Sequence, residues 1–367
     1  MNGFIVRGAS AAAGITLLAV GGALPAAAQS AGGHTAGVAR TWLNGVAASS
    51  GRAAFAVGYA GNGPLAVRWN GSSWRRVPSP SPSQNAIFNG VAALSARRAL
   101  AVGCFSVGHD SSQVLIERWN GSTWRPMPVP NVPGGGDLWG VTALSARDAW
   151  AVGESGDPNN GSTKTLILHW NGIAWKRVPS PGTTRGVNAQ LFGVAAVSAR
   201  DAWAVGDSGL TTQNLVLHWN GTSWKRVPTP SATRGAVLNG VAATGGAVWA
   251  VGTLSASTYQ TLILRWTGNH WVRAPSPSPT ADGGSQLYAV AITGKTAWAV
   301  GYAGGRTLIE RWNGTAWARV PSPSPSGPDD LKSVTAVSAS QAWAAGESNG
   351  KTLILAWNGS AWRRQAS

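Results

Sequence analysis

Two sets of side chains occupy fixed positions in a repeated sequence pattern, yet their identities change from one repeat to the next. The first set follows the leading apolar residue of each repeat: Asn44, Asn89, Trp139, Phe192, Asn239, Tyr288 and Lys332. The second set follows a glycine that ends the next apolar run: Tyr59, Cys104, Glu154, Asp207, Thr253, Tyr302 and Glu347. Aromatic rings beside amide and carboxylate groups suit the stacking and hydrogen bonding of a sugar or a peptide. We predict that both sets, apart from Cys104 and Thr253, bind a ligand; the alternative is that the first set only fills the centre of the fold.

The carboxylates of the second set also allow a catalytic interpretation. Glu154, Asp207 or Glu347 could serve as general acid or base in a hydrolase or lyase, which needs paired carboxylates at a suitable separation. The sequence contains no nucleophile elbow, no HExxH and no P-loop, and its five histidines show no metal-ligand spacing. We therefore expect binding without catalysis, with no metal and no other cofactor.

The elements that must position these side chains form a repeat of four short strand-like runs, complete in Leu191–Pro230. The pattern starts seven times, at Leu43, Phe88, Leu138, Leu191, Leu238, Leu287 and Leu331, with spacings of 44 to 53 residues. A period of this length with four strands per unit is typical of a β-propeller with one repeat per blade. We predict an all-β, seven-bladed β-propeller with four antiparallel strands in each blade.

The composition of each run predicts its place in the blade. The first run has a small residue at its third position, which suits a crowded axis, and the fourth carries proline in six repeats, which suits an outer edge strand. The turns after the first and third runs are uniform, the latter being Trp-Asn-Gly in six repeats. The other two connections vary and share the opposite face, where binding sites usually lie. We place the candidate site on that face.

Tryptophan recurs at fixed positions in the repeat. Pairs five residues apart close the third run and open the fourth: 69/74, 119/124, 170/175, 219/224, 266/271, 312/317 and 357/362. Five more stand in the second run, where Phe55 and Leu100 fill the remaining repeats. Sugar-stacking rings are one interpretation. We favour a core role, because the positions recur wherever one blade must pack on the next.

The N-terminus has the features of an export signal. Arg7 precedes a mostly apolar run, and Ala26–Ala28 form an A-x-A cleavage motif, so residues 1–28 are predicted as a signal peptide and 29–42 as a leader before the propeller at 43–367. The apolar run is too short to span a membrane. The single cysteine, Cys104, permits no disulfide within the chain, and we interpret it as a tolerated small residue.

The chain is basic, with 29 Lys and Arg against 13 Asp and Glu; without Arg7 the charge is 28 − 13 = +15. This balance suggests an anionic partner such as acidic polysaccharide, cell-wall polyanion or nucleic acid. Much of the charge lies in the fourth run, where it could equally protect edge strands from aggregation. The Asn-Gly-Ser/Thr sequons likewise follow from the turn and need no glycan.

The order of elements resembles kelch and galactose-oxidase propellers: an inner strand, a strand ending in glycine, a turn, then tryptophan and a proline-tipped outer strand. It departs from kelch in having Val-Gly, as at Val205-Gly206, where kelch has paired glycine. The run Asp201–Gly206 with the later Trp-Asn-Gly-x-x-Trp is also similar to Asp-box and photosystem assembly-factor propellers, which carry Asp-Gly-Gly before their tryptophan. It is more similar still to exported repeat proteins of high-GC bacteria. The resemblance covers residues 43–367 and implies the fold, whereas the copper site of galactose oxidase has no counterpart motif.

From these features we expect a secreted, monomeric binding module. The favoured ligand is a glycan or another cell-surface polymer on the variable face, with no specific nucleic acid and no membrane span. Two alternatives remain open at this point: a carbohydrate-active hydrolase or lyase on the same scaffold, and a basic structural protein of the cell envelope or matrix.

Overall fold

The computed structural model describes residues 40–61, 63–80, 85–107, 111–156, 163–181, 188–209, 213–233, 235–255, 258–277, 284–325 and 327–366. The predicted signal peptide and residues 29–39 of the predicted leader lie outside the described residues. Within the described residues no helix has the length and apolar character needed to cross a membrane.

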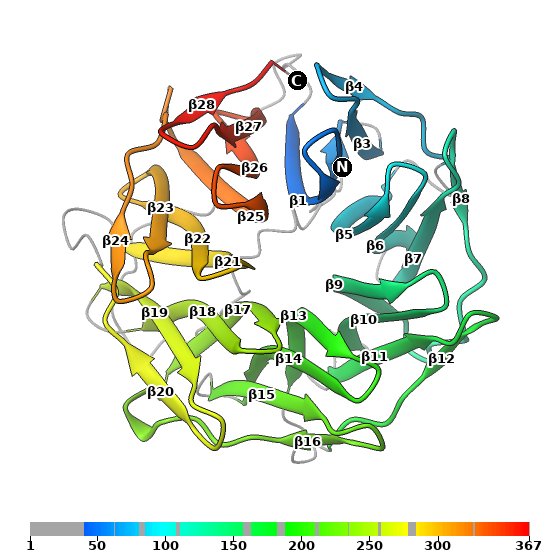
Figure 1. Ribbon diagram of the computed structural model, residues 1–367. Coiled ribbons are helices and arrows are strands. Elements are labelled where there is room, and N and C mark those ends of the chain that lie inside the picture. Colours follow the sequence, from blue (N-terminus) through cyan, green and yellow to red (C-terminus); the bar gives the residue numbers. More distant parts are fainter. Residues whose placement is uncertain are drawn as a thin grey trace, which may run out of the picture.

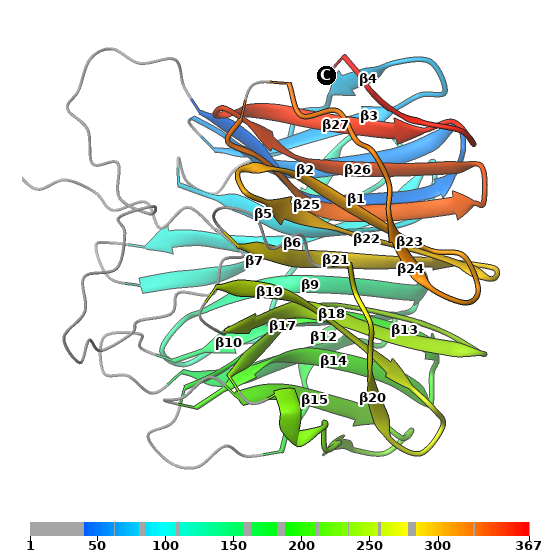
Figure 2. The same cartoon turned by 90° about the vertical axis from the view of Figure 1, so that its left-hand side faces the viewer.

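Seven four-stranded antiparallel sheets form the blades of a closed ring, which confirms the predicted seven-bladed β-propeller (Figure 1). Each sheet is one continuous stretch of the chain, paired in sequence order from β1-β2-β3-β4 to β25-β26-β27-β28. The first strand of each blade surrounds the centre and the fourth forms the rim, as the proline positions predict. The strands run across the ring from one face to the other (Figure 2).

The innermost strands are β1 (Thr41–Ser50), β5 (Ile87–Ser95), β9 (Gly136–Ser145), β13 (Ala189–Ser198), β17 (Ala236–Thr244), β21 (Ser285–Thr293) and β25 (Asp329–Ser338). The second strands are β2 (Ala53–Ala60), β6 (Arg98–Val107), β10 (Asp148–Ser155), β14 (Asp201–Ser208), β18 (Ala247–Ser255), β22 (Thr296–Ala303) and β26 (Gln341–Ser348). The third are β3 (Pro64–Trp69), β7 (Ser111–Trp119), β11 (Lys164–Trp170), β15 (Gln213–Trp219), β19 (Tyr259–Trp266), β23 (Arg306–Trp312) and β27 (Lys351–Trp357). The outer strands are β4 (Trp74–Arg76), β8 (Trp124–Pro126), β12 (Trp175–Arg177), β16 (Trp224–Arg226), β20 (Trp271–Ala274), β24 (Trp317–Arg319) and β28 (Trp362–Arg364); a single 3₁₀ turn, η1, spans Ser231–Thr233.

Small residues in the innermost strands let neighbouring strands approach closely around the axis. A Cβ added to Gly90 would lie 2.8 Å from the backbone oxygen of Trp139 in the next blade, and one on Gly240 would lie 2.8 Å from that of Tyr288. Neither distance is compatible with a normal carbon–oxygen contact. The predicted role of the small third position is therefore confirmed.

The tryptophans form the core between blades. Those of the outer strands are 1–6% exposed and those of the second strands 0–3% exposed. Trp150 of β10 packs on Trp219 and Trp224 of the next blade, with ring centroids 5.0 and 5.2 Å away. The same contact recurs from Trp203, Trp249 and Trp298 to the following blade. This arrangement supports the core interpretation over sugar stacking.

Hydrogen bonds close the ring between the last blade and the first, and no strand is exchanged between these blades in the described part of the chain. The backbone N–H of Thr41 in β1 donates to the carbonyl of Gly350 at 2.9 Å, and that of Val46 donates to the Ser333 hydroxyl of β25 at 3.0 Å. Among the residues that the structure describes, the last blade consists of its own four strands, and Thr41 and Trp42 of the predicted leader pair with β2.

The two faces of the ring are distinguished by which connections they carry. The indole N–H of Trp219 at the end of β15 donates to the carbonyl of Ala199 in the turn between β13 and β14 at 3.1 Å, and four other blades repeat this bond. The first-to-second and third-to-fourth turns therefore share one face, called here the turn face. The opposite face, with the variable connections, is the loop face.

Candidate functional site

The first set of predicted residues lies on the loop face, each at a β-bulge in an innermost strand. In blade seven the pairing passes from Leu331–Gly346 to Ser333–Ala345, which leaves Lys332 unpaired, and every other blade skips the equivalent residue. The bulge also explains the invariant glycine of the second strand, since a Cβ on Gly346 would overlap the carbonyl oxygen of Asp330.

Three asparagines of the first set link neighbouring blades. The side-chain N–H of Asn44 donates to the carbonyl of Phe88 at 3.0 Å, that of Asn89 to Leu138 at 3.0 Å, and that of Asn239 to Leu287 at 2.8 Å. Asn89 and Asn239 are buried. Their donors are therefore engaged within the ring, and the site argued below is built from the other members.

Blades three and four bring aromatic and acidic side chains together. Trp139 packs edge-on against Phe192, with ring centroids 6.2 Å apart, and both rings are half-buried. Glu154 and Asp207 stand after the second-strand glycines of the same two blades. Burial raises the pKa of Asp207 to about 6. These two blades therefore carry both a partly exposed ring surface and two carboxyl groups.

Blades six and seven build a second cluster around a buried cation. The ammonium of Lys332 lies 4.2 Å from the Tyr288 ring centroid and 2.7 Å from Oδ2 of Asp330. Burial lowers the pKa of Lys332, but Tyr288, Asp330 and Glu347 outweigh it, and the net shift is upward. Burial also raises the pKa of Glu347, with Asp330 adding to the shift. Tyr302 stacks on Tyr288 at 6.1 Å.

A third set, which the sequence reasoning missed, lies opposite the second. Each innermost strand begins one or two residues before its predicted start and pairs there with the residue after the second-strand glycine. The residues so added are Trp42, Ile87, Asp137, Gln190, Val237, Gln286 and Asp330. Trp42 packs on Tyr59 at 4.7 Å, and the Gln286 amide donates to the Tyr302 hydroxyl at 3.2 Å. The sequence could have indicated them: if the second strand is extended by one residue past its glycine, the innermost strand must begin earlier to pair with that residue.

Several polar atoms at this end of the strands have no hydrogen-bond partner among the described residues. Four atoms are both buried and without a partner: Oδ1 of Asp137, Oδ1 of Asp330, Oγ1 of Thr253 and Oδ1 of Asn239. Buried polar atoms in native proteins are normally paired. These four atoms are buried, so a ligand on the loop face does not reach them in this structure.

Cysteine and histidine give no reactive or metal-binding centre in the described part of the chain. Burial raises the pKa of the Cys104 thiol well above its usual value, and the carboxylates of Asp137 and Glu154 raise it further, so the reactive thiolate is disfavoured. His169 and His218 lie far from this site, each bonded to a second-strand aspartate. No three His, Cys, Asp or Glu side chains gather as metal ligands within the described ranges.

Two clefts open at equivalent places in the outer parts of blades three and six. One, of about 440 Å³, is lined among others by Lys164, Thr165, Arg177 and Ser180. The other, of about 430 Å³, is lined among others by Arg306, Thr307, Arg319 and Ser322. Two cations beside a bonded pair of hydroxyls can accept an anionic substituent. The clefts do not include any of the predicted site residues.

Charges are separated between the two faces. Six described carboxylates stand at starts of innermost strands or ends of second strands, on the loop face: Asp137, Glu154, Asp207, Asp329, Asp330 and Glu347. Glu117 and Glu310 are fully buried in third strands, and burial raises the pKa of each to about 7. In a strongly basic chain, the loop face near the axis is thus its acidic region.

No protein-family profile and no curated protein matches the chain. Solved structures match it in fold. YCF48 bound to a D1 peptide has a TM-score of 0.55 at 14% identity, covering 90% of this chain and 93% of that one. YCF48 from Cyanidioschyzon merolae has a TM-score of 0.57 at 16% identity, with coverages of 87% and 96%. YjhT has a TM-score of 0.52 at 11% identity, with coverages of 76% and 97%. Likeness at these identities shows the β-propeller fold.

Proposed function

We propose that the chain is a secreted, non-catalytic binding module that takes a glycan or another cell-surface polymer on the loop face around the axis. The observation that carries the proposal is the pair of partly exposed rings, Trp139 and Phe192, in the two blades whose second strands carry Glu154 and Asp207 after their glycines. Sugar rings offer apolar faces for stacking and hydroxyl donors for carboxylate acceptors. A rigid ring with different side chains in each blade suits a ligand that is recognised once.

The test is a glycan and polysaccharide array followed by calorimetry on the mature protein. Trp139→Ala should weaken binding roughly tenfold or more, since stacking of a ring contributes about 1 kcal/mol beyond its buried area. The matched control is Trp219→Ala, a half-buried tryptophan on the turn face, which should leave the affinity unchanged. Binding should also persist at moderate salt, because stacking and neutral hydrogen bonds are not screened. Equal losses in both variants would contradict the proposal.

A peptide is the second candidate ligand. It is supported by the structural neighbour solved with a peptide bound, although the likeness itself extends only to the fold. The same acceptors suit backbone N–H groups. A peptide library screened in parallel with the glycans decides between the two, since binding to peptides alone would replace the glycan in this proposal.

One observation favours catalysis, the raised pKa of about 6 at Asp207. A general acid needs a raised pKa so that it is protonated near neutral pH. If a polysaccharide is turned over, Asp207→Asn or Glu154→Gln should abolish turnover while the bound state persists. The proposal of a non-catalytic module predicts that no array glycan is cleaved.

A further inference from the structure

Four successive blades present an arginine at the same position of the turn face. These residues, Arg52, Arg97, Arg147 and Arg200, stand in the turn between the innermost and second strands of blades one to four, and all are exposed. They do not belong to an edge strand, so the protection of outer edges does not explain them.

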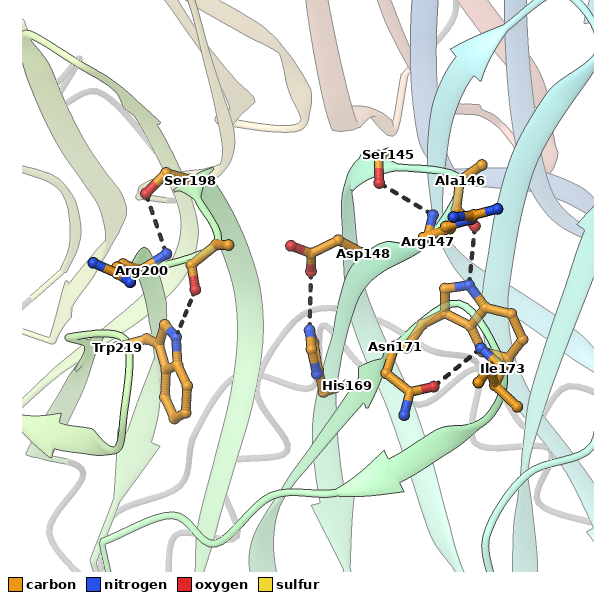
Figure 3. Close-up of polar contacts among 12 residues, drawn as sticks. Ser145, Ala146, Arg147, Asp148, His169, Asn171, Ile173, Ser198, Arg200 and Trp219 are labelled. Atoms are coloured by element: carbon orange, nitrogen blue, oxygen red, sulfur yellow. Dashed lines mark hydrogen bonds and ion pairs between the residues drawn. The ribbon is translucent and has the colours of Figure 1, made fainter.

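Each arginine is held by a set of contacts that repeats from blade to blade (Figure 3). In blade three the Ser145 hydroxyl accepts a hydrogen bond from the backbone N–H of Arg147 at 3.1 Å, and the Ala146 carbonyl accepts the Trp170 indole N–H at 3.0 Å. A Cβ on Gly172 of the Asn-Gly turn would lie 2.9 Å from the Arg147 Cβ, so the arginine stem lies against this turn. The serine-to-arginine bond recurs at Ser50–Arg52, Ser95–Arg97 and Ser198–Arg200.

A second cation stands on the outer strand of each of these blades, directly after its tryptophan. The four are Arg75, Arg125, Lys176 and Lys225, all exposed. Because the outer strand starts at the turn face, these cations lie on the same side of the ring as the turn arginines. We call the eight residues the basic crescent.

The remaining three blades lack this pairing. The equivalent positions are Gly246 and Val272 in blade five, Lys295 and Ala318 in blade six, and Ser340 and Arg363 in blade seven. A repeat that needed the two cations for folding would carry them in every blade. Their confinement to blades one to four points to a partner that covers this part of the ring.

The crescent is not neutralised within the described residues. Asp148 and Asp201 follow two of the turn arginines, but their carboxylates face histidines. Asp148 lies 2.9 Å from His169 (Figure 3), and Asp201 lies 3.0 Å from His218. The third ion pair is on the loop face. The other described carboxylates are buried or lie on the loop face.

We propose that the basic crescent binds a linear polyanion through its repeated phosphate or sulfate groups. The planar guanidinium fork matches tetrahedral oxyanions, and one cation pair per blade suits a chain of regularly spaced charges. Nucleobases are not the target, because the nearby indoles are packed on other rings: Trp219, for example, contacts Trp150 and Trp224. The proposal is independent of the loop-face ligand.

The experiment measures binding of long-chain inorganic polyphosphate and of a heparin fragment to the whole mature protein across a salt series. A fourfold variant, R52Q/R97Q/R147Q/R200Q, should bind at least tenfold more weakly, and the slope of log K against log salt should fall by about 3. The control variant R40Q/R273Q/K351Q/R364Q removes four exposed cations outside both the crescent and the two clefts, and it should change the affinity less than threefold. Polyphosphate against heparin separates a phosphate preference from a sulfate preference.

A gain of binding provides the converse test. A Cβ on Gly246 meets no atom within 4 Å, so Gly246→Arg with Val272→Lys extends the crescent into blade five and should tighten binding. Equal weakening in the two fourfold variants would show that only net charge matters and would overturn the proposal. So would the absence of polyphosphate and heparin binding, or a clear preference for single-stranded DNA over polyphosphate of equal charge.

Discussion

On the turn face, blades one to four repeat an arginine at one position, whereas on the loop face the bulge position holds asparagine, tryptophan, phenylalanine, tyrosine or lysine. The turn face is basic and the loop face near the axis is acidic. Both faces are built on the same strands and the same tryptophan core. Repetition of a side chain suits a ligand that is itself repetitive, and variation suits a ligand recognised once.

The comparison of the two faces is informative because the tryptophan core does not determine which side chains stand on either face. Core positions recur in all seven blades, as the outer-strand tryptophans do. The turn arginines recur in four blades. At the loop-face bulge position, the asparagine shared by blades one, two and five links neighbouring blades, and the residues of the other four blades all differ. Residues shared by all seven blades are therefore required by the fold, whereas residues shared by some blades are assigned to the fold or to a partner from their contacts.

The largest effect should come from removing a shared core ring. Trp224→Ala empties a site that is 4% exposed and should destabilise the protein by roughly 3–5 kcal/mol, measured by urea unfolding. Under folding conditions the surviving protein should bind at both faces. A variant of unchanged stability that lost loop-face binding would show that the core rings themselves contact the ligand.

The next effect concerns a buried acid between the two faces. Ser276 donates to Glu310 at 2.9 Å, yet burial raises the Glu310 pKa from 4.5 to about 7, so the folded protein holds this proton more tightly than the unfolded chain. Stability should therefore fall as the pH rises from about 4.5 to 7 and level off above it. Glu310→Gln should raise the free energy of unfolding above that of the parent protein more at pH 8 than at pH 5. The difference between the two pH values should be on the order of 1 kcal/mol or more.

Chemical unfolding of both proteins at the two pH values measures this difference. Glu310→Ala serves as the control that removes the packing as well. If Glu310→Gln changed binding at either face, the two faces would be coupled through the core rather than independent.

A smaller effect should show whether Asn239 on the loop face links two blades or contacts the ligand. Asn239→Ala removes the hydrogen bond to the Leu287 carbonyl and should cost about 0.5–1.5 kcal/mol of stability without a change in ligand affinity. The opposite result, normal stability with lost affinity, would return Asn239 to the ligand-binding set predicted from the sequence.

The smallest effect should be that of a single crescent residue on the fold. Arg147 is exposed, so Arg147→Gln should change the free energy of unfolding by no more than about 0.5 kcal/mol. The affinity of the Arg147→Gln variant for the polyanion should fall modestly. A large loss of stability would mean that the arginine serves the turn and not a partner.

The repeat predicted blade number, strand order and core because turn chemistry and tryptophan spacing recur seven times. It did not predict the bulges, since one extra residue per inner strand leaves the spacing unchanged. Asp330 and Asp137 were missed because the innermost strands begin one or two residues before the predicted starts, and Lys332 was named without its partner. The outer-strand cations of the crescent were visible in the sequence but were attributed to edge protection, and the four turn arginines were not singled out. The structure shows in addition that each turn arginine lies against the Asn-Gly turn that leads into the outer strand.

The seam between the last blade and the first has a consequence for how the chain can be arranged. Every sheet is one uninterrupted segment, and bonds such as Thr41 to Gly350 join the ends without a covalent link. A circularly permuted chain that began at β5 and ended at β4, with a linker across the seam, would contain the same seven sheets. The place where the polypeptide starts is therefore arbitrary with respect to the ring, and whole blades are the natural units for rearranging or transplanting either face.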